Sequence, residues 1–207
     1  MSHALTPYVD AAFPLRGDAI PLDHGYALFA ALSHRLPALH ERSDWGLHPV
    51  RGQRRGRDLL ELTRHSQVKL RLPADDAGKI MALAGQSVDI HDHRARLGVP
   101  RLLPLVPTPV LKARFVTVKG FFDDPAPFAL ALRRQLARMP GLGQDPERVE
   151  LTLGRRRVLH ARDHTVVGWA TILAGLDAQA SLVVQQRGLG GRRHLGAGLF
   201  VPPPRSA

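Results

Sequence analysis

The spacing of apolar positions in the first half of the chain predicts strands that alternate with two helices. Apolar side chains at Tyr26, Phe29, Leu32 and Leu36 recur with a period near 3.6, which is typical of a helix that Pro37 ends or kinks. Strands are predicted at residues 8–15, 45–50, 59–63, 67–72, 87–90 and 93–97, and a second short helix at 77–83. We expect the third predicted strand to pair with the fourth, and the fifth with the sixth. The order of this half is then β-α-β-β-α-β.

The second half repeats this order after a proline-rich stretch. Residues 100–111 contain four prolines and few polar residues, so we expect a stiff connector there. It separates a predicted N-terminal domain at 1–99 from a predicted C-terminal domain at 112–207. Strands are predicted at 112–119, 148–153, 158–160, 166–173 and 199–201, and helices at 125–139 and 179–186. The predicted fold class is α+β, with two tandem ferredoxin-like folds.

The composition favours a polyanionic partner. Lys and Arg number 29 against 18 Asp and Glu, which gives a formal net charge of +11. Only four of the 29 cations are lysines. The arginine excess suits bidentate phosphate recognition, and a GC-rich genome would produce the same bias.

The sequence lacks several features that would indicate another class of protein. It has no cysteine, which excludes disulfides and thiolate metal sites. It shows no secretion signal and no run of about 18 apolar residues. We therefore expect a cytoplasmic protein with no membrane partner.

A glycine-rich segment near the C-terminus is the most distinctive motif. Its glycines, which lie between a predicted helix and a predicted strand, are Gly188, Gly190, Gly191, Gly196 and Gly198. Consecutive N–H groups in such a loop can form an anion-binding concavity, to which Arg187, Arg192 and Arg193 would add charge. The helix-to-strand order and the lack of a following Gly-Lys-Ser/Thr exclude a P-loop. The alternative is a helix C-cap followed by a tight turn.

The motif Gly-x-Gly-Gly-Arg-Arg-x-x-Gly-x-Gly-hydrophobic resembles the loop of a known family. The family is that of the CRISPR-associated endoribonucleases of the RAMP superfamily, and the resemblance is greatest to the branch found in the myxobacterial variant of type I systems. It extends over nearly the whole chain. It implies two ferredoxin-like folds, with the loop between the last helix and the last strand of the second.

The resemblance also suggests where a catalytic base would lie. Family members commonly show a proline, then Asn/Asp-His, a first helix, and a Leu-His element with the catalytic histidine. Here Pro21, Asp23-His24 and Leu39-His40 follow that order, which makes His40 the first candidate for the base and His34 the second. Relatives often carry a catalytic tyrosine at a position that falls near Ser33, so we expect Ser33 either to replace it or to leave that role unfilled. We expect His24 to have a structural role.

Arginines outside the loop are candidate phosphate contacts. The helix predicted at 125–139 carries Arg133, Arg134 and Arg138, of which the last two share a face. Arg155, Arg156 and Arg157 form a predicted basic hairpin turn. Each set could instead be a solvated surface, and the same holds for the basic loop at 51–57. His91 and His93 lack a third ligand at a standard spacing, so we predict no metal site and no cofactor.

Together with these features, the resemblance predicts a metal-independent endoribonuclease that binds CRISPR repeat RNA and cleaves precursor CRISPR RNA. The resemblance implies attack by a 2′-hydroxyl, a 2′,3′-cyclic phosphate and a 5′-hydroxyl. Many family members keep the product and join other subunits of the effector complex. The alternative is a non-catalytic RNA-binding subunit of the same superfamily, because Ser33 occupies the tyrosine position.

Overall fold

The chain forms two units, Met1–Pro104 and Leu105–Ala207, in a computed structural model that describes residues 6–121, 123–161 and 164–204. Both units combine helices with antiparallel sheets, so the predicted α+β class is confirmed. Among the described residues, no helix is both long enough and apolar enough to span a membrane.

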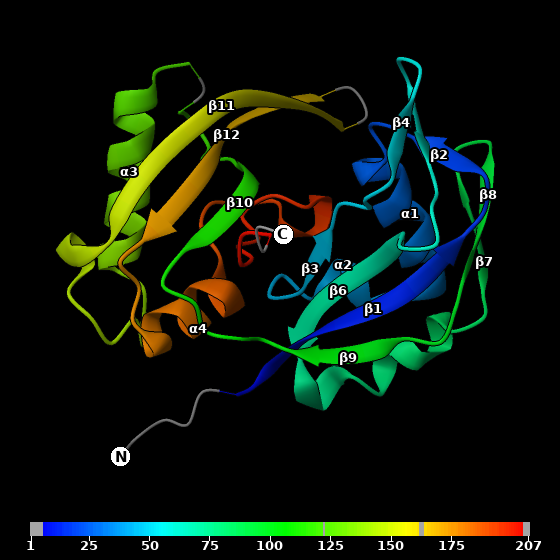
Figure 1. Cartoon of the computed structure of the whole chain (residues 1–207), viewed down its shortest axis with the longest axis horizontal. Helices are drawn as coiled ribbons and strands as arrows, with labels where there is room; N and C mark the ends of the chain where they lie inside the picture. The colour runs from blue at the N-terminus through cyan, green and yellow to red at the C-terminus, as the bar shows by residue number, and fades with distance from the viewer. Residues whose placement is uncertain (1–5, 122, 162–163, 205–207) are drawn as a thin grey trace. The chain divides into compact units, whose positions relative to one another are not determined.

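The first unit contains most of the strands (Figure 1). Its strands are β1 (Tyr8–Arg16), β2 (Ala19–Pro21), β3 (Gly46–His48), β4 (Gln53–Arg55), β5 (Leu59–Glu61), β6 (Gln67–Pro73), β7 (Ser87–Ile90), β8 (His93–Leu97) and β9 (Arg101–Pro104). Its helices are α1 (Gly25–Arg35), α2 (Ala38–Glu41) and the 3-10 helices η1 (Ala74–Asp76) and η2 (Lys79–Leu83).

The long strand β1 organises the main sheet of this unit. It pairs with β6 along one edge, and with β9 and then β8 along the other, while β3 extends the sheet beyond β6. The resulting order β9-β1-β6-β3, with α1 and η2 in the two crossovers, is that of a β-α-β-β-α-β unit. Residues 101–104, which we expected in the connector, therefore belong to the first sheet. Proline is tolerated at both ends of β9 because it is an edge strand.

A buried ion pair crosses this sheet. Arg71 on β6 is 1% exposed and donates from Nε and Nη2 to the carboxylate of Asp10 on β1, at 2.7 and 2.9 Å. Nε2 of His48 on β3 lies 3.4 Å from the same carboxylate, too far for a well-formed hydrogen bond. Burial therefore dominates and lowers the pKa of His48. Burial raises the pKa of Asp10, but the interactions with His48 and Arg71 outweigh it and hold that pKa well below its usual range.

A separate small sheet has the order β2-β5-β4, so our expectation that residues 59–63 pair with 67–72 is wrong. The alternation of apolar and polar residues in β5 does not determine its partners, which are set by hydrogen bonds at the two ends of the strand. Leu62 N donates to Asp18 O and Leu22 N donates to Asp58 O, which hold β5 beside β2. A bidentate ion pair between Arg55 and Asp18 then joins β4 to the turn before β2.

The second unit is a three-stranded sheet with two helices packed on one face. Its elements are β10 (Leu111–Val116), α3 (Pro125–Ala137), η3 (Pro146–Arg148), β11 (Glu150–Ala161), β12 (His164–Ala174), α4 (Ala178–Arg187) and η4 (Arg193–Leu195). The sheet order is β10-β12-β11. Phe128 and Leu132 of α3 and Val184 of α4 share one buried core with Leu111 and Leu173 of the sheet.

Two details of this unit correct the prediction. Arg155, Arg156 and Arg157 lie within β11 and do not form a turn, because pairing with β12 continues past them as far as Ala161. The final strand predicted at 199–201 is reduced to a bridge in which Val201 and Lys112 exchange hydrogen bonds. That bridge still places Val201 beside β10, after the glycine-rich loop.

Candidate functional site

His40 lies on the short helix α2 of the first unit and is exposed. Pro37 begins this helix, and the buried side chain of Leu39 anchors it. The imidazole meets the Phe29 ring of α1 edge-on, with the ring centroids 4.7 Å apart and the planes at 72°. One side of the imidazole is thus fixed against an aromatic ring while the side chain stays accessible.

The end of α2 is held by an ion-pair network that the sequence reading missed. Arg42 donates to both carboxylate oxygens of Asp44 at 2.8 Å and lies 2.8 Å from Asp76. Asp76 also accepts from the indole of Trp45 and pairs with Lys79. Hydrogen bonding to Asp44 raises the pKa of Arg42 above its ordinary value. The network fixes the backbone directly after His40.

The other two catalytic candidates on α1 differ in accessibility. His34 is exposed near the end of the helix. Ser33 is 5% exposed, and its hydroxyl has no hydrogen-bond partner among the described residues. A group with so little exposure cannot contact a polynucleotide in this conformation, so the structure gives no support to Ser33 as a replacement for tyrosine.

His24 has a structural role, as its sequence position suggested. Its Nε2 accepts a hydrogen bond from the backbone N–H of Val50 at 2.9 Å, which requires that nitrogen to be unprotonated. Nδ1 then carries the proton and donates to the carbonyl of Pro21 at 3.0 Å. Both ring nitrogens are used: Nε2 joins the start of α1 to the segment after β3, and Nδ1 joins it to the end of β2.

The glycine-rich segment of the second unit needs glycine for its backbone shape. Gly188, Gly190, Gly196 and Gly198 all have φ between 67° and 84°, where a side chain is strained. A Cβ on Gly190 would also overlap the carbonyl oxygen of Thr117. The chain here packs backbone against backbone.

The glycines do not supply the free N–H groups that we predicted for an anion-binding concavity. The five glycine N–H groups all donate within the protein, to oxygens of Val184, Gln135, Thr117, Arg193 and Phe115, in chain order. The glycines therefore shape the loop, and none of their own N–H groups is free to bind an anion. The sequence motif identified the loop correctly but could not show that its donors are used.

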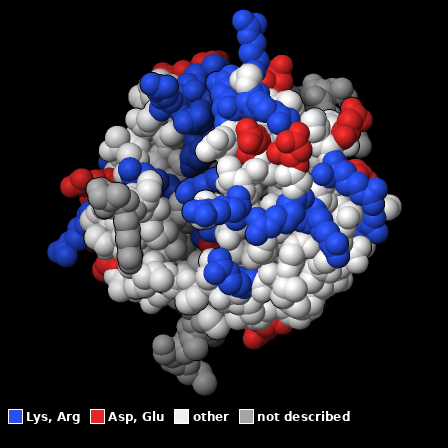
Figure 2. Space-filling view, turned by 45° about the vertical axis from the view of Figure 1, so that its right-hand side comes forward, with Lys and Arg blue, Asp and Glu red and all other residues white. Residues whose placement is uncertain are grey.

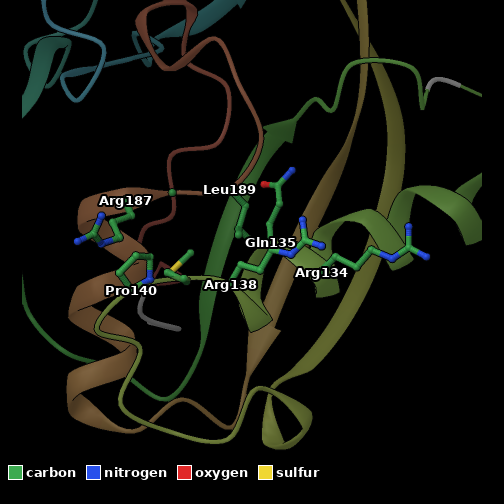
Figure 3. Close-up of a pocket in the computed structure, with 8 residues that line it drawn as sticks. Arg134, Gln135, Arg138, Pro140, Arg187 and Leu189 are labelled. Atoms are coloured by element: carbon green, nitrogen blue, oxygen red, sulfur yellow. The ribbon is translucent and has the colours of Figure 1, made fainter.

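A pocket of about 290 Å³ opens beside the start of this loop. Its lining residues are Arg134, Gln135, Arg138, Met139, Pro140, Arg187, Gly188 and Leu189. No lining residue is acidic, so the three guanidinium groups make the pocket positive. Figure 3 shows Arg187 on one side of Pro140 and Leu189, with Gln135 of α3 and Arg138 directly after that helix on the other, and Arg134 extending away. Arg134 and Arg138 from the predicted helix set thus line one pocket with Arg187 from the loop set.

Gln135 is a residue of this pocket that the sequence reading missed. Its side-chain oxygen accepts a 2.8 Å hydrogen bond from the N–H of Gly190, which joins α3 to the loop. Its position one residue after Arg134 gave no signal, because an isolated glutamine on a helix is ordinary. Its role depends on a loop 55 residues further along the chain.

The remaining predicted contacts lie elsewhere. Arg192 is exposed and has φ 60°, while Arg193 donates from NH1 to the carbonyl of Arg187 at 2.7 Å and so helps to close the loop. Arg133 lies on α3 outside the pocket lining. Arg155, Arg156 and Arg157 are exposed on β11, and Arg156 pairs with Asp123 at 2.7 Å. Where the structure describes the chain, no group of three or more His, Cys, Asp or Glu residues is placed to hold a metal ion.

An α+β chain whose second unit carries a glycine loop beside an arginine pocket is similar in fold to solved CRISPR-associated and RAMP proteins. The Cas6 CRISPR family model matches residues 9–205, and the chain is a member of the Cas6 family.

The relatives agree with this assignment. The chain is 44% identical over 203 residues to the CRISPR-associated endonuclease Cas6 of Myxococcus xanthus strain DK1622, covering 98% of this chain and 85% of the relative. A Cas6-related protein from Pyrococcus furiosus has a similar fold, with a TM-score of 0.68, 15% identity and coverage of 96% and 99%. Thermus thermophilus Cse3, bound to an RNA representing a pre-cleavage complex, also has a similar fold. The TM-score is 0.53 and the sequence identity 18%, with coverage of 95% of this chain and 100% of Cse3.

Proposed function

We propose that this chain is an endoribonuclease that binds CRISPR repeat RNA and cleaves precursor CRISPR RNA without a metal ion. The observation that carries the proposal is the 44% identity, over almost the whole chain, to a protein named as a CRISPR-associated endonuclease. The solved structure of Thermus thermophilus Cse3 with an RNA that represents a pre-cleavage complex supports RNA as the substrate.

In the proposed reaction, the imidazole of His40 takes the proton of the 2′-hydroxyl next to the scissile phosphate. The 2′-oxygen attacks phosphorus, the bond to the 5′-oxygen breaks, and the leaving oxygen takes up a proton. The products are a 2′,3′-cyclic phosphate and a 5′-hydroxyl. The exposure of His40 and its fixed helix support this assignment, because a general base must reach its proton in a defined geometry. His34 remains the second candidate.

RNA binding is assigned to arginine side chains. Arg134, Arg138 and Arg187 would pair with backbone phosphates at the pocket, since guanidinium groups bind phosphate oxygens bidentately. Arg192 and the exposed arginines of β11 would extend these contacts. We further propose that the protein keeps the cleaved RNA bound and joins other subunits of the effector complex.

A non-catalytic RNA-binding subunit is the second candidate. The burial of Ser33 favours it, because no group at that position is available to assist the base. Under this alternative, the wild-type protein binds the repeat and leaves it intact.

One experiment tests the proposal against this alternative. End-labelled repeat RNA is incubated with the protein in EDTA, alongside the same RNA with a single 2′-deoxy substitution at the scissile nucleotide. We expect one cut in the first RNA, none in the second, and similar binding of both. Cutting that stops on chelation and returns with magnesium contradicts the mechanism, and normal cutting of the deoxy RNA requires a water nucleophile.

A further inference from the structure

The hairpin formed by β4 and β5 in the first unit is a basic surface that the proposed function does not use. Residues 51–58 are all exposed, and four of them are arginines. In Figure 1 the loop after β4 projects beyond β2. Figure 2 shows Lys and Arg side chains grouped over the face in view, with Asp and Glu in smaller groups.

The hairpin is anchored in several places. Gly52 lies so close to β5 that a Cβ would overlap the carbonyl oxygen of Glu61. The carbonyl of Arg51 accepts a 2.7 Å hydrogen bond from the Ser66 hydroxyl. Arg55 is held by Asp18 through two bonds of 2.8 and 3.0 Å. The backbone of the hairpin is thus fixed at both ends of β4.

The four arginines have two roles. Two of them stabilise the hairpin through contacts within the protein, and the other two leave their guanidinium groups open to solvent. Arg55 is neutralised by Asp18, and Arg54 donates to the carbonyls of Gly56 and Arg57, which closes the tip. Within the described part of the chain, no hydrogen bond or ion pair engages the guanidinium of Arg51 or Arg57. These two residues are six positions apart, so they can be separated by no more than about 20 Å of extended chain.

We infer that this arginine hairpin is a second RNA contact, one that binds the sugar-phosphate backbone without reading bases. The inference rests on the proposed function, because it takes RNA as the partner. The surface from Arg51 to Asp58 has no apolar side chain. Protein interfaces depend on buried aromatic and aliphatic anchors, whereas nucleic-acid interfaces are polar and strongly positive. A pre-formed hairpin also loses little conformational entropy on binding.

The test compares two double variants of equal charge. Arg51→Ala/Arg57→Ala removes the presented pair, and Arg101→Ala/Arg148→Ala removes two exposed arginines outside the hairpin. Affinity is measured from about 50 to 300 mM salt with repeat RNA and with an unrelated RNA of equal length. Thermal unfolding of both variants checks that the fold is intact.

We expect the hairpin variant to bind both RNAs about 10- to 50-fold more weakly at 0.1 M salt. The slope of log affinity against log salt should fall by about two units, one for each lost phosphate contact. The control variant should change affinity less than about threefold. A hairpin variant that matches the control overturns the inference and leaves the proposed function standing. Failure of the wild type to bind any RNA overturns both.

Discussion

Gln135 and Gly190 are joined by a 2.8 Å hydrogen bond from the backbone N–H of the glycine to the side-chain oxygen of the glutamine. The bond connects the arginine-bearing helix α3 to the loop that borders the same pocket. It predicts how two substitutions of one residue should differ.

Gln135→Ala removes the acceptor and leaves the Gly190 N–H unpaired, which should lower the free energy of unfolding by about 1–2 kcal/mol. Gln135→Glu keeps an acceptor but adds a negative charge among the pocket arginines. It should retain stability and bind RNA more weakly. Urea unfolding and RNA titration of both variants separate the two effects, and equal stability of Ala and Glu variants would contradict a structural role for the bond.

Removing the pocket arginines should weaken binding in a salt-dependent way. Arg138→Ala/Arg187→Ala loses two exposed guanidinium groups that line the pocket. The slope of log affinity against log salt should fall by about two units, with the fold unchanged. The measurement is repeat binding across a salt series. An unchanged slope would mean that the pocket does not contact phosphate.

His40→Ala should slow single-turnover cleavage by about 10²- to 10⁴-fold, the usual contribution of a general base. Repeat affinity should change less than tenfold, or about 1.4 kcal/mol. His34→Ala serves as the matched control, because it removes another exposed histidine of the same unit and should cause only a small loss. If the two results are exchanged, the base lies on α1.

Gly190→Ala should destabilise the protein by about 2 kcal/mol or more, because φ is 76° and the new Cβ overlaps the Thr117 carbonyl. Gly191→Ala is the control one residue away. A Cβ there meets nothing within 4 Å, and φ is not positive, so stability should stay within about 0.5 kcal/mol. Equal unfolding midpoints for the two variants would contradict this prediction, because they would mean that the loop backbone moves to accommodate the new Cβ.

Acid should destabilise the first unit in two steps. The pKa of His48 is lowered by burial, so below about 6.5 the unfolded state takes up a proton that the folded state resists, and stability falls. The pKa of Asp10 is also lowered, so its ion pair contributes stability above about 3.8 that is lost as the pH falls further. His48→Gln should flatten the first step in urea unfolding between pH 5 and 8. An unchanged pH profile would place the titrating group elsewhere.

Local patterns in the sequence predicted most elements but not all of their partners. The period of α1 and the break at Pro37 were readable, because both follow from side-chain spacing and the missing proline N–H. The pairing of β5 with β2 was not, because it depends on backbone hydrogen bonds between two segments that are far apart in the sequence. Residues 155–157 were misplaced because an arginine run looks like a turn when the continuing cross-strand pairing is unknown.

The candidate site shows the same division. Composition and the glycine motif led to the loop and to the pocket arginines, since both signals are local. The burial of Ser33, the use of every glycine N–H and the bond to Gln135 are tertiary facts. Spacing alone carries no information about which donors a folded chain has already used.

Because the glycine N–H groups of the loop already donate hydrogen bonds within the protein, the loop has its final shape before any ligand binds. Under the proposed function, little rearrangement would have to accompany RNA binding at the pocket, so association should be governed by charge attraction and diffusion. Association should then be fast and fall steeply with ionic strength, while substitutions that alter close packing in the loop should act mainly on the lifetime of the complex. The glycines would thus control how long RNA is held, and the arginines how quickly it is captured.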